Sequence, residues 1–217
     1  MKGIIILSII ILLSSCGRNC SIPAGYVFEF PITLSPAQET YQIGDTITIT
    51  SFFSDEVYER KTGIHYNLID FKFYPEMQMR EISDTTANEA ALSDFEVLIP
   101  SEYDFQEYIY GSGSVAYSGE YKYENGNYEL SYKIIPQSKG LFYFSFISSL
   151  ATIDEYQDFE DKCPGESSSA RAQLNDSADN NIHLLNESLD PFYNEWRLAD
   201  PDGRFHRYAS YCFRVVE

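Results

Sequence analysis

The stretch VAYSGEYKYENGNYELSYKII, residues 115–135, decides the predicted fold. Aromatic and aliphatic residues alternate with polar ones on both sides of Asn125-Gly126. An Asn-Gly pair readily adopts the positive φ angles of a tight hairpin turn. Val115 to Tyr123 and Tyr128 to Ile135 are therefore predicted to pair as antiparallel strands. Pro136 ends the second strand, because proline cannot donate a ladder hydrogen bond.

Similar β patterns recur on both sides of this hairpin. Leu141 to Ile147 is a nearly continuous apolar run, which is typical of a buried central strand. The run ITIT at 47–50 places isoleucines on one face and threonines on the other, and Ile43 is expected to share the isoleucine face. Such short segments, separated by turn signals, predict a mainly β chain. We expect one antiparallel β-sandwich domain over residues 26–217.

Two further features refine this prediction. The segment Tyr41-Gln42-Ile43-Gly44-Asp45-Thr46, before the alternating strand, resembles the start of the second strand in many bacterial immunoglobulin-like domains, which implies an immunoglobulin-like β-sandwich. Apolar residues recur at spacings of three and four near the C-terminus, which predicts a helical insertion at about residues 166–189. These residues are Ala170, Leu174, Ala178, Ile182, Leu185 and Leu189.

Residues 1–16 have the order of a secretory signal. Lys2 precedes the apolar run Ile4 to Leu12, which is shorter than the roughly 20 residues that a membrane span needs. Leu13-Ser14-Ser15-Cys16 resembles the lipobox of bacterial lipoproteins. The resemblance implies that residues 1–15 are a signal peptide, that Cys16 is lipidated and that residues 16–25 form a tether. The alternative is an ordinary signal peptide with Cys16 free or disulfide-bonded.

The residue after the cysteine bears on localisation. In lipoproteins of this type an aspartate there often signals retention in the inner membrane, whereas this chain has Gly17. The resemblance therefore implies an outer membrane lipoprotein and leaves open whether it faces the periplasm or the cell surface. The net charge of −18 opposes binding to phosphate backbones, so nucleic acid is not an expected partner.

Three cysteines remain if Cys16 carries a lipid. An exported protein meets an oxidising compartment, so one disulfide is expected. We predict Cys163–Cys212, because these residues flank the predicted helical segment and the last strand, whereas Cys20 lies in the predicted tether. Cys20 is then free or pairs between chains. No CxxC or CxxH spacing indicates zinc, and we expect no metal and no cofactor.

No sequence pattern identifies a catalytic site. The chain lacks Gly-x-Ser-x-Gly, His-Glu-x-x-His and a phosphate-binding glycine loop, and its histidines have no neighbour at metal-ligand spacing. We therefore expect a protein that is not an enzyme. One alternative is a hydrolase of envelope polymers with a dispersed carboxylate site. Another is a structural spacer in an outer-membrane assembly.

Tyrosines are dense between residues 103 and 123, and Tyr117, Tyr121 and Tyr123 are the candidate ligand-binding residues. Aromatic faces beside carboxamides and carboxylates suit neutral glycans. Cross-strand tyrosine pairs that stabilise a sheet are the alternative interpretation. The predicted function is a lipid-anchored module of the cell envelope that binds a glycan or an envelope protein.

Overall fold

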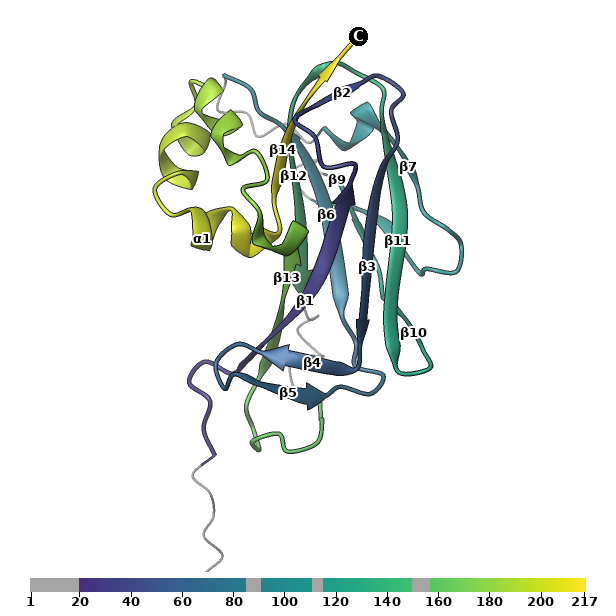
Figure 1. The fold of residues 1–217 in the computed structure, drawn as a ribbon, viewed down its shortest axis with the longest axis vertical. Coiled ribbons are helices and arrows are strands. Elements are labelled where there is room, and N and C mark those ends of the chain that lie inside the picture. Colours follow the sequence, from purple (N-terminus) through teal and green to yellow (C-terminus); the bar gives the residue numbers. More distant parts are fainter. Residues whose placement is uncertain (1–19, 85–90, 111–114, 150–156) are drawn as a thin grey trace, which may run out of the picture.

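The computed structural model describes residues 20–84, 91–110, 115–149 and 157–217. Two β-sheets pack face to face, and a lobe of short helical turns lies beside them (Figure 1). The lipobox with Cys16 lies outside the described residues. None of the helices within them has both the length and the apolar composition needed to cross a bilayer.

The first sheet has the strand order β10-β11-β3-β1-β4-β5, with β13 also paired to β1 and β7 to β11. Its strands are β1 (Tyr26–Ser35), β3 (Ile47–Ser54), β4 (Glu56–Glu59), β5 (Ile64–Asn67), β7 (Phe95–Leu98), β10 (Lys122–Glu124), β11 (Asn127–Pro136) and β13 (Ser168–Leu174). The second sheet has the order β2-β14-β12-β6-β9-β8. Its strands are β2 (Thr40–Gln42), β6 (Tyr74–Glu81), β8 (Gln106–Ile109), β9 (Val115–Ser118), β12 (Gly140–Ser149) and β14 (Tyr211–Val216).

The helical elements are short, and most of them lie near the C-terminus. They are the 3₁₀ turns η1 (Leu92–Asp94), η2 (Asn175–Ser177), η3 (Ile182–Glu187) and η5 (His206–Tyr208), the π-helical turn η4 (Phe192–Arg197) and the α-helix α1 (Pro201–Arg204). Residues 182–208 form the lobe drawn in yellow-green in Figure 1, which we call the C-terminal lobe. It packs on Tyr143 of β12 and Cys212 of β14.

Aromatic rings fill the space between the two sheets. Phe30 and Phe53 of the first sheet lie against Phe73, which precedes β6, with ring centroids 5.3 and 5.7 Å apart. Phe95 of β7 similarly meets Phe142 of β12 at 4.9 Å. Such rings bury large apolar areas and favour edge-to-face contacts. The tyrosine and phenylalanine content of the sequence therefore supplies the core.

The β-sandwich prediction is confirmed: the chain is mainly β, and most strand pairs are antiparallel. The parallel pairs β1–β13 and β2–β14 are exceptions. The run Leu141 to Ile147 forms the central strand β12, as predicted. Ile43 departs from its prediction, because it lies in the turn before β3 and is 44% exposed.

The hairpin prediction is half right. Asn125 and Gly126 do form the turn, with φ angles of 52° and 76°, and they join β10 to β11. The first predicted strand splits, however, because Val115–Ser118 pairs with β6 and β8 in the second sheet. The chain changes sheets at Gly119, where a Cβ atom would lie 2.4 Å from the Asp104 carbonyl oxygen. Alternation alone carries no information about such a change of sheet.

The predicted helical insertion at 166–189 is only partly correct, because the helical part of this segment is small. Residues 168–174 form β13, which runs parallel to β1, and only short 3₁₀ turns follow. The reason lies in the polar residues after Leu174, since asparagine and aspartate tolerate the left-handed conformation. Positive φ angles occur at Asn175, Asp176, Ser177, Asn180 and Asn181. The apolar spacing of three and four therefore does not correspond to one continuous helix.

Candidate interaction face

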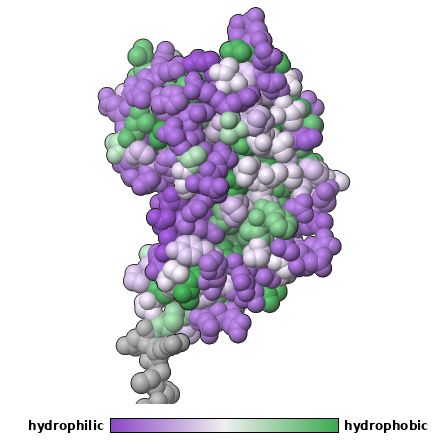
Figure 2. All heavy atoms as spheres, in the orientation of Figure 1, coloured by the Kyte–Doolittle hydropathy of each residue, from purple (hydrophilic) through white to green (hydrophobic). Residues whose placement is uncertain are grey.

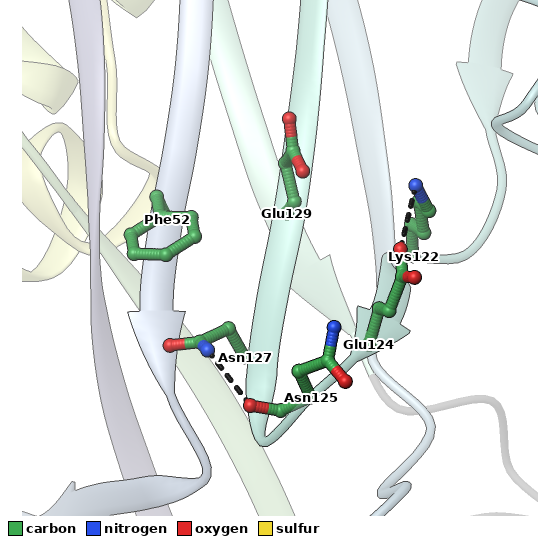
Figure 3. A pocket seen from close by; sticks show the side chains of 6 residues that line it. All are labelled: Phe52, Lys122, Glu124, Asn125, Asn127 and Glu129. Atoms are coloured by element: carbon green, nitrogen blue, oxygen red, sulfur yellow. Dashed lines mark hydrogen bonds and ion pairs between the residues drawn. The ribbon is translucent and has the colours of Figure 1, made fainter.

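The outward surface of the first sheet carries an exposed aromatic ring. Phe52 of β3 is 63% exposed, because the inward positions of this strand are Ile47, Ile49, Ser51 and Phe53. Phe52 lies opposite Glu129 of β11, which in turn lies opposite Lys122 of β10. Residues directly opposite each other share a sheet face. These three side chains therefore form one row across three strands (Figure 3).

Neighbouring rows extend this surface. Thr50 lies opposite Ser131, and Ser54 lies opposite Asn127, which is paired with Glu124. We call these outward side chains the Phe52 face. It consists of Thr50, Phe52, Ser54, Lys122, Glu124, Asn127, Glu129 and Ser131. A shallow depression lies over part of it, lined by Phe52, Lys122, Glu124, Asn125, Asn127 and Glu129 (Figure 3).

The charged groups of the Phe52 face are paired. Lys122 Nζ lies 2.9 Å from Glu124 Oε2, and a hydrogen bond and the negative charge of Glu124 raise the pKa of Lys122. Tyr103 donates a hydrogen bond to Glu129 Oε1 at 3.5 Å. Such pairs fix the positions of polar groups at a solvent-exposed surface but contribute little to stability. The ring of Phe52 therefore lies among oriented polar groups of both charge signs.

A second depression continues the surface along β11 toward β7. Leu98 of β7 is exposed opposite Lys133 of β11, and Pro100 and Ser131 complete the lining with their neighbours. In Figure 2, apolar and near-neutral side chains gather over the strands of the first sheet, whereas the C-terminal lobe is mostly hydrophilic. Flat surfaces with a few apolar side chains among polar ones are typical of protein interfaces. The geometry suits contact with another macromolecule.

The structure does not bring the three predicted ligand-binding tyrosines together on an exposed face. Tyr121 is buried against Phe30 and Phe53. Tyr123 of β10 faces the core beside Tyr128 and donates a hydrogen bond to Asp55 Oδ2 at 2.8 Å. Tyr117 belongs to the other sheet, where its hydroxyl donates to Glu107 Oε2 at 3.3 Å. Their alternation marks the inward side of the strands, so the sheet-stabilising interpretation fits their positions.

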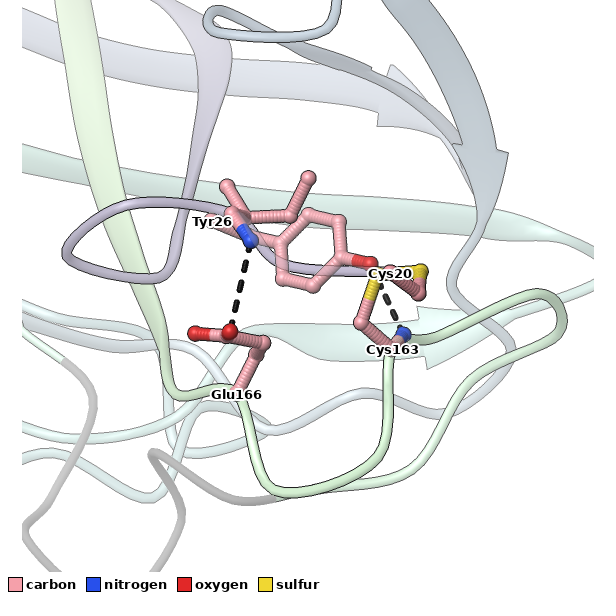
Figure 4. Close-up of a disulfide and its surroundings, with 5 residues drawn as sticks. Cys20, Tyr26, Cys163 and Glu166 are labelled. Atoms are coloured by element: carbon pink, nitrogen blue, oxygen red, sulfur yellow. Dashed lines mark hydrogen bonds between the residues drawn. A yellow bond between two sulfur atoms is a disulfide. The ribbon is translucent and has the colours of Figure 1, made fainter. Parts of the chain in front are cut away.

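The predicted disulfide is also corrected. Cys163 is bonded to Cys20, with Cα atoms 5.3 Å apart (Figure 4). Cys212 is a fully buried thiol on β14, packed against the C-terminal lobe, and burial raises its pKa well above the usual value. Cys163 lies in the core beside Tyr26, whose hydroxyl accepts a hydrogen bond from the Cys163 N–H at 2.9 Å. Cys163 and Cys212 thus lie in two separate clusters.

The segment after Cys20 is fixed to the domain by further contacts. Lys61 Nζ donates hydrogen bonds to the carbonyl oxygens of Pro23, at 2.6 Å, Ala24, at 3.0 Å, and Gly25. The Ile22 N–H donates to Glu166 Oε1 at 3.3 Å (Figure 4). We call these contacts, together with the disulfide, the N-terminal clamp. The clamp lies at the same end of the molecule as β4 and β5 (Figure 1).

Sequence reasoning missed Phe52 although a signal for it exists. The alternation in ITITSFFS, residues 47–54, already places residue 52 on the side of the threonines. Within the described residues, no group of three or more His, Cys, Asp or Glu side chains is arranged to hold a metal ion. His65 and His183 are exposed, and His206 is half-buried.

Comparison with known proteins gives distant structural neighbours only. The chain matches no family model and no curated protein. A type II cohesin domain from the cellulosome of Acetivibrio cellulolyticus is 11% identical, covering 58% of this chain and 77% of that chain, with a TM-score of 0.28. The non-cellulosomal cohesin from the hyperthermophilic archaeon Archaeoglobus fulgidus is 11% identical, covering 89% and 91%, with a TM-score of 0.30. At such TM-scores the likeness carries no argument about what this chain binds.

Proposed function

We propose that this chain is a non-enzymatic binding module of the cell envelope, anchored through a lipid on Cys16, which recognises a partner protein through the Phe52 face. The observation that carries the proposal is the 63% exposure of Phe52 within a flat strand surface. In the free domain the ring of Phe52 keeps apolar surface in contact with water, and burial of that surface is favourable. At a protein interface the same ring becomes a buried anchor surrounded by polar contacts.

The composition of the surface supports a protein partner. Lys122, Glu124 and Glu129 place both charge signs beside Phe52, and Lys133 lies further along β11. Charges of both signs at the rim of an interface select among partners and fix their orientation. Thr50, Ser131 and Asn127 add short polar side chains that donate and accept hydrogen bonds. A patterned surface of this kind fits a folded protein surface better than a uniform polymer.

The N-terminal clamp supports the anchoring part of the proposal. Cys20 lies four residues after Cys16, and this span reaches at most about 14 Å when fully extended. A lipid on Cys16 would therefore hold the β4–β5 end of the domain close to the bilayer. The Phe52 face runs along the side of the sandwich, where a neighbouring envelope protein has access to it. Lipidation and outer-membrane localisation remain part of this proposal.

Site-specific photocrosslinking tests the proposed face. A photoreactive phenylalanine analogue at position 52, in cells of the source organism, is expected to give a discrete crosslinked species whose partner is then identified and purified. Phe52→Ala should weaken binding to that purified partner by about 30-fold, which corresponds to about 2 kcal/mol, the scale of an interface hot spot. The ring contributes that much because binding removes it from water.

The matched control is Ile69→Ala. Ile69 is 66% exposed and lies in a turn between β5 and β6, outside the Phe52 face. This variant removes a similar apolar group, so its affinity for the partner should stay at the wild-type value. The Phe52 face would be ruled out as the binding surface if both variants lost the same affinity for the partner. It would also be ruled out if the photoreactive residue crosslinked the partner from position 69 and not from position 52.

A further inference from the structure

The outward surface of the second sheet has a covered half and an open half. The C-terminal lobe covers β12 and β14, where Leu184, Leu185 and Phe205 pack with Tyr143 and Cys212. In the other half of the sheet, the outward side chains of β6 and of β8 are half-buried or exposed. They include Glu76, Gln78, Arg80, Tyr108 and Tyr110, which follows β8. The open half thus holds a concentration of aromatic and polar groups.

Strand register brings these groups onto one surface. Gln78 of β6 lies opposite Ala116 of β9, which lies opposite Tyr108 of β8. Glu76 is two residues before Gln78 and therefore points to the same side. Ala116, the small residue of this row, is fully buried among its larger neighbours. Tyr108 and Gln78 stand on either side of it.

Tyr108 and Tyr110 form an aromatic corner. Their ring centroids are 4.8 Å apart, and their planes meet at 77°. Tyr110 donates a hydrogen bond to Glu76 Oε2, which fixes its ring over β6, and burial followed by this bond raises its pKa to about 12. Tyr108 is 56% exposed, and one side of its ring contacts Tyr110. The corner is therefore preformed and open to solvent.

The polar side chains of β6 are held in fixed orientations next to this corner. Gln78 Nε2 donates to Glu76 Oε1, and Arg80 Nη2 donates to Gln78 Oε1 at 3.2 Å. Arg80 lies near the C-terminal lobe, where its charge opposes the burial-driven rise in the pKa of Tyr193. Along β6, the side chains of Glu76, Gln78 and Arg80 thus present a carboxylate, a carboxamide and a guanidinium in one line. Preoriented groups lose little entropy when a ligand binds.

We infer that this surface binds a pyranose ring of a neutral glycan. A sugar ring has a face of C–H groups, which stacks on an aromatic ring, and a rim of hydroxyls, which both donate and accept hydrogen bonds. Tyr108 provides the stacking surface, and Gln78, Glu76 and Arg80 provide the polar contacts. The chain carries a net charge of −18, which opposes approach of an anionic polymer. The site lies on the opposite sheet from the Phe52 face and does not depend on it.

Affinity electrophoresis in native gels tests the inference. The purified domain, with Cys16→Ala to keep it free of lipid, is run through gels that contain dextran, mannan, laminarin, galactomannan or xyloglucan. Retardation by at least one polysaccharide is expected. Tyr108→Ala should weaken that retardation by roughly tenfold in affinity, because the stacking surface is lost. Tyr108→Phe should keep the wild-type affinity, because the ring remains.

Tyr58→Ala is the matched control, because Tyr58 is an exposed tyrosine on β4 of the other sheet. The gels should retard the Tyr58→Ala variant as strongly as the wild type. Thermal melting should show that all variants are folded. Lack of retardation of the wild type by every polysaccharide would overturn the inference, and so would equal loss in Tyr58→Ala and Tyr108→Ala. Binding of the protein partner is measured separately and should be unchanged in Tyr108→Ala.

Discussion

Glu59 shows how one buried carboxylate organises an end of this domain. It is fully buried at the end of β4 and accepts hydrogen bonds from the N–H groups of Val27, at 2.8 Å, and Thr62, at 2.6 Å. The Thr62 hydroxyl and the Lys61 N–H also donate to it. Burial alone would raise the pKa of Glu59, but these hydrogen bonds outweigh burial, and its pKa lies below the usual value.

Glu59→Gln should destabilise the domain by about 2 kcal/mol at neutral pH, because hydrogen bonds to a charged group are lost. A lowered folded-state pKa contributes stability above the unfolded pKa of about 4.3, and this contribution is lost as the pH falls through the folded-state value. The difference in unfolding free energy between wild type and variant should therefore shrink below about pH 4. Urea unfolding at several pH values measures it.

Glu56→Gln is the control for this prediction, because Glu56 is exposed on the same strand. It should change stability by less than about 0.5 kcal/mol, as most surface substitutions do. If the two variants lost the same stability at neutral pH, or if the Glu59 effect did not depend on pH, the proposed role of the Glu59 carboxylate would be wrong.

At the scale of the elements, strand β13 and the disulfide that precedes it, Cys20–Cys163, show which features the sequence could not predict. The inward faces of β3 and the central position of β12 follow from alternation and from a continuous apolar run, which are local properties. The pairing of β13 with β1 joins residues 168–174 to residues 26–32 and depends on contacts distant in sequence. The disulfide Cys20–Cys163 has the same origin, because its separation of 143 residues cannot be read from spacing. The Phe52 face depends on a local pattern and on long-range pairing. Alternation along β3 points Phe52 outward, but only the strand register places Lys122 in the same row.

Replacing both Cys20 and Cys163 by serine should destabilise the domain by about 2–4 kcal/mol, because the closed loop restricts the unfolded chain. Urea unfolding of the Cys16→Ala protein, with and without the two replacements, measures the loss. Without reductant, the denatured Cys16→Ala protein should show one reactive thiol, that of Cys212. Cys212→Ala is the control and should keep the disulfide while showing no reactive thiol. A disulfide-linked peptide that contains Cys212 would contradict the pairing.

At the scale of the whole molecule, the short span from Cys16 to Cys20 sets an orientation if Cys16 carries the lipid. β5 lies at the clamped end, whereas Lys139 pairs with Glu217 at the opposite end (Figure 1). A fluorophore on Asn67→Cys, in β5, should transfer more energy to acceptors in the lipid headgroups of vesicles than one on Lys139→Cys. The Cys16→Ala protein should not bind the vesicles. Equal transfer from the two labelled positions would exclude the orientation.

The N-terminal clamp has a mechanical consequence. β1 and β13 are parallel neighbours, with Tyr26 opposite Ser168, and the disulfide joins the segments that lead into them. Tension on the chain before Cys20 would reach β1 through the backbone and β13 through the disulfide at once. The two strands would carry load as a unit, and the force would act as shear on the ladder between β1 and β3. A protein pulled by a bound partner would thus be reinforced where the pull enters.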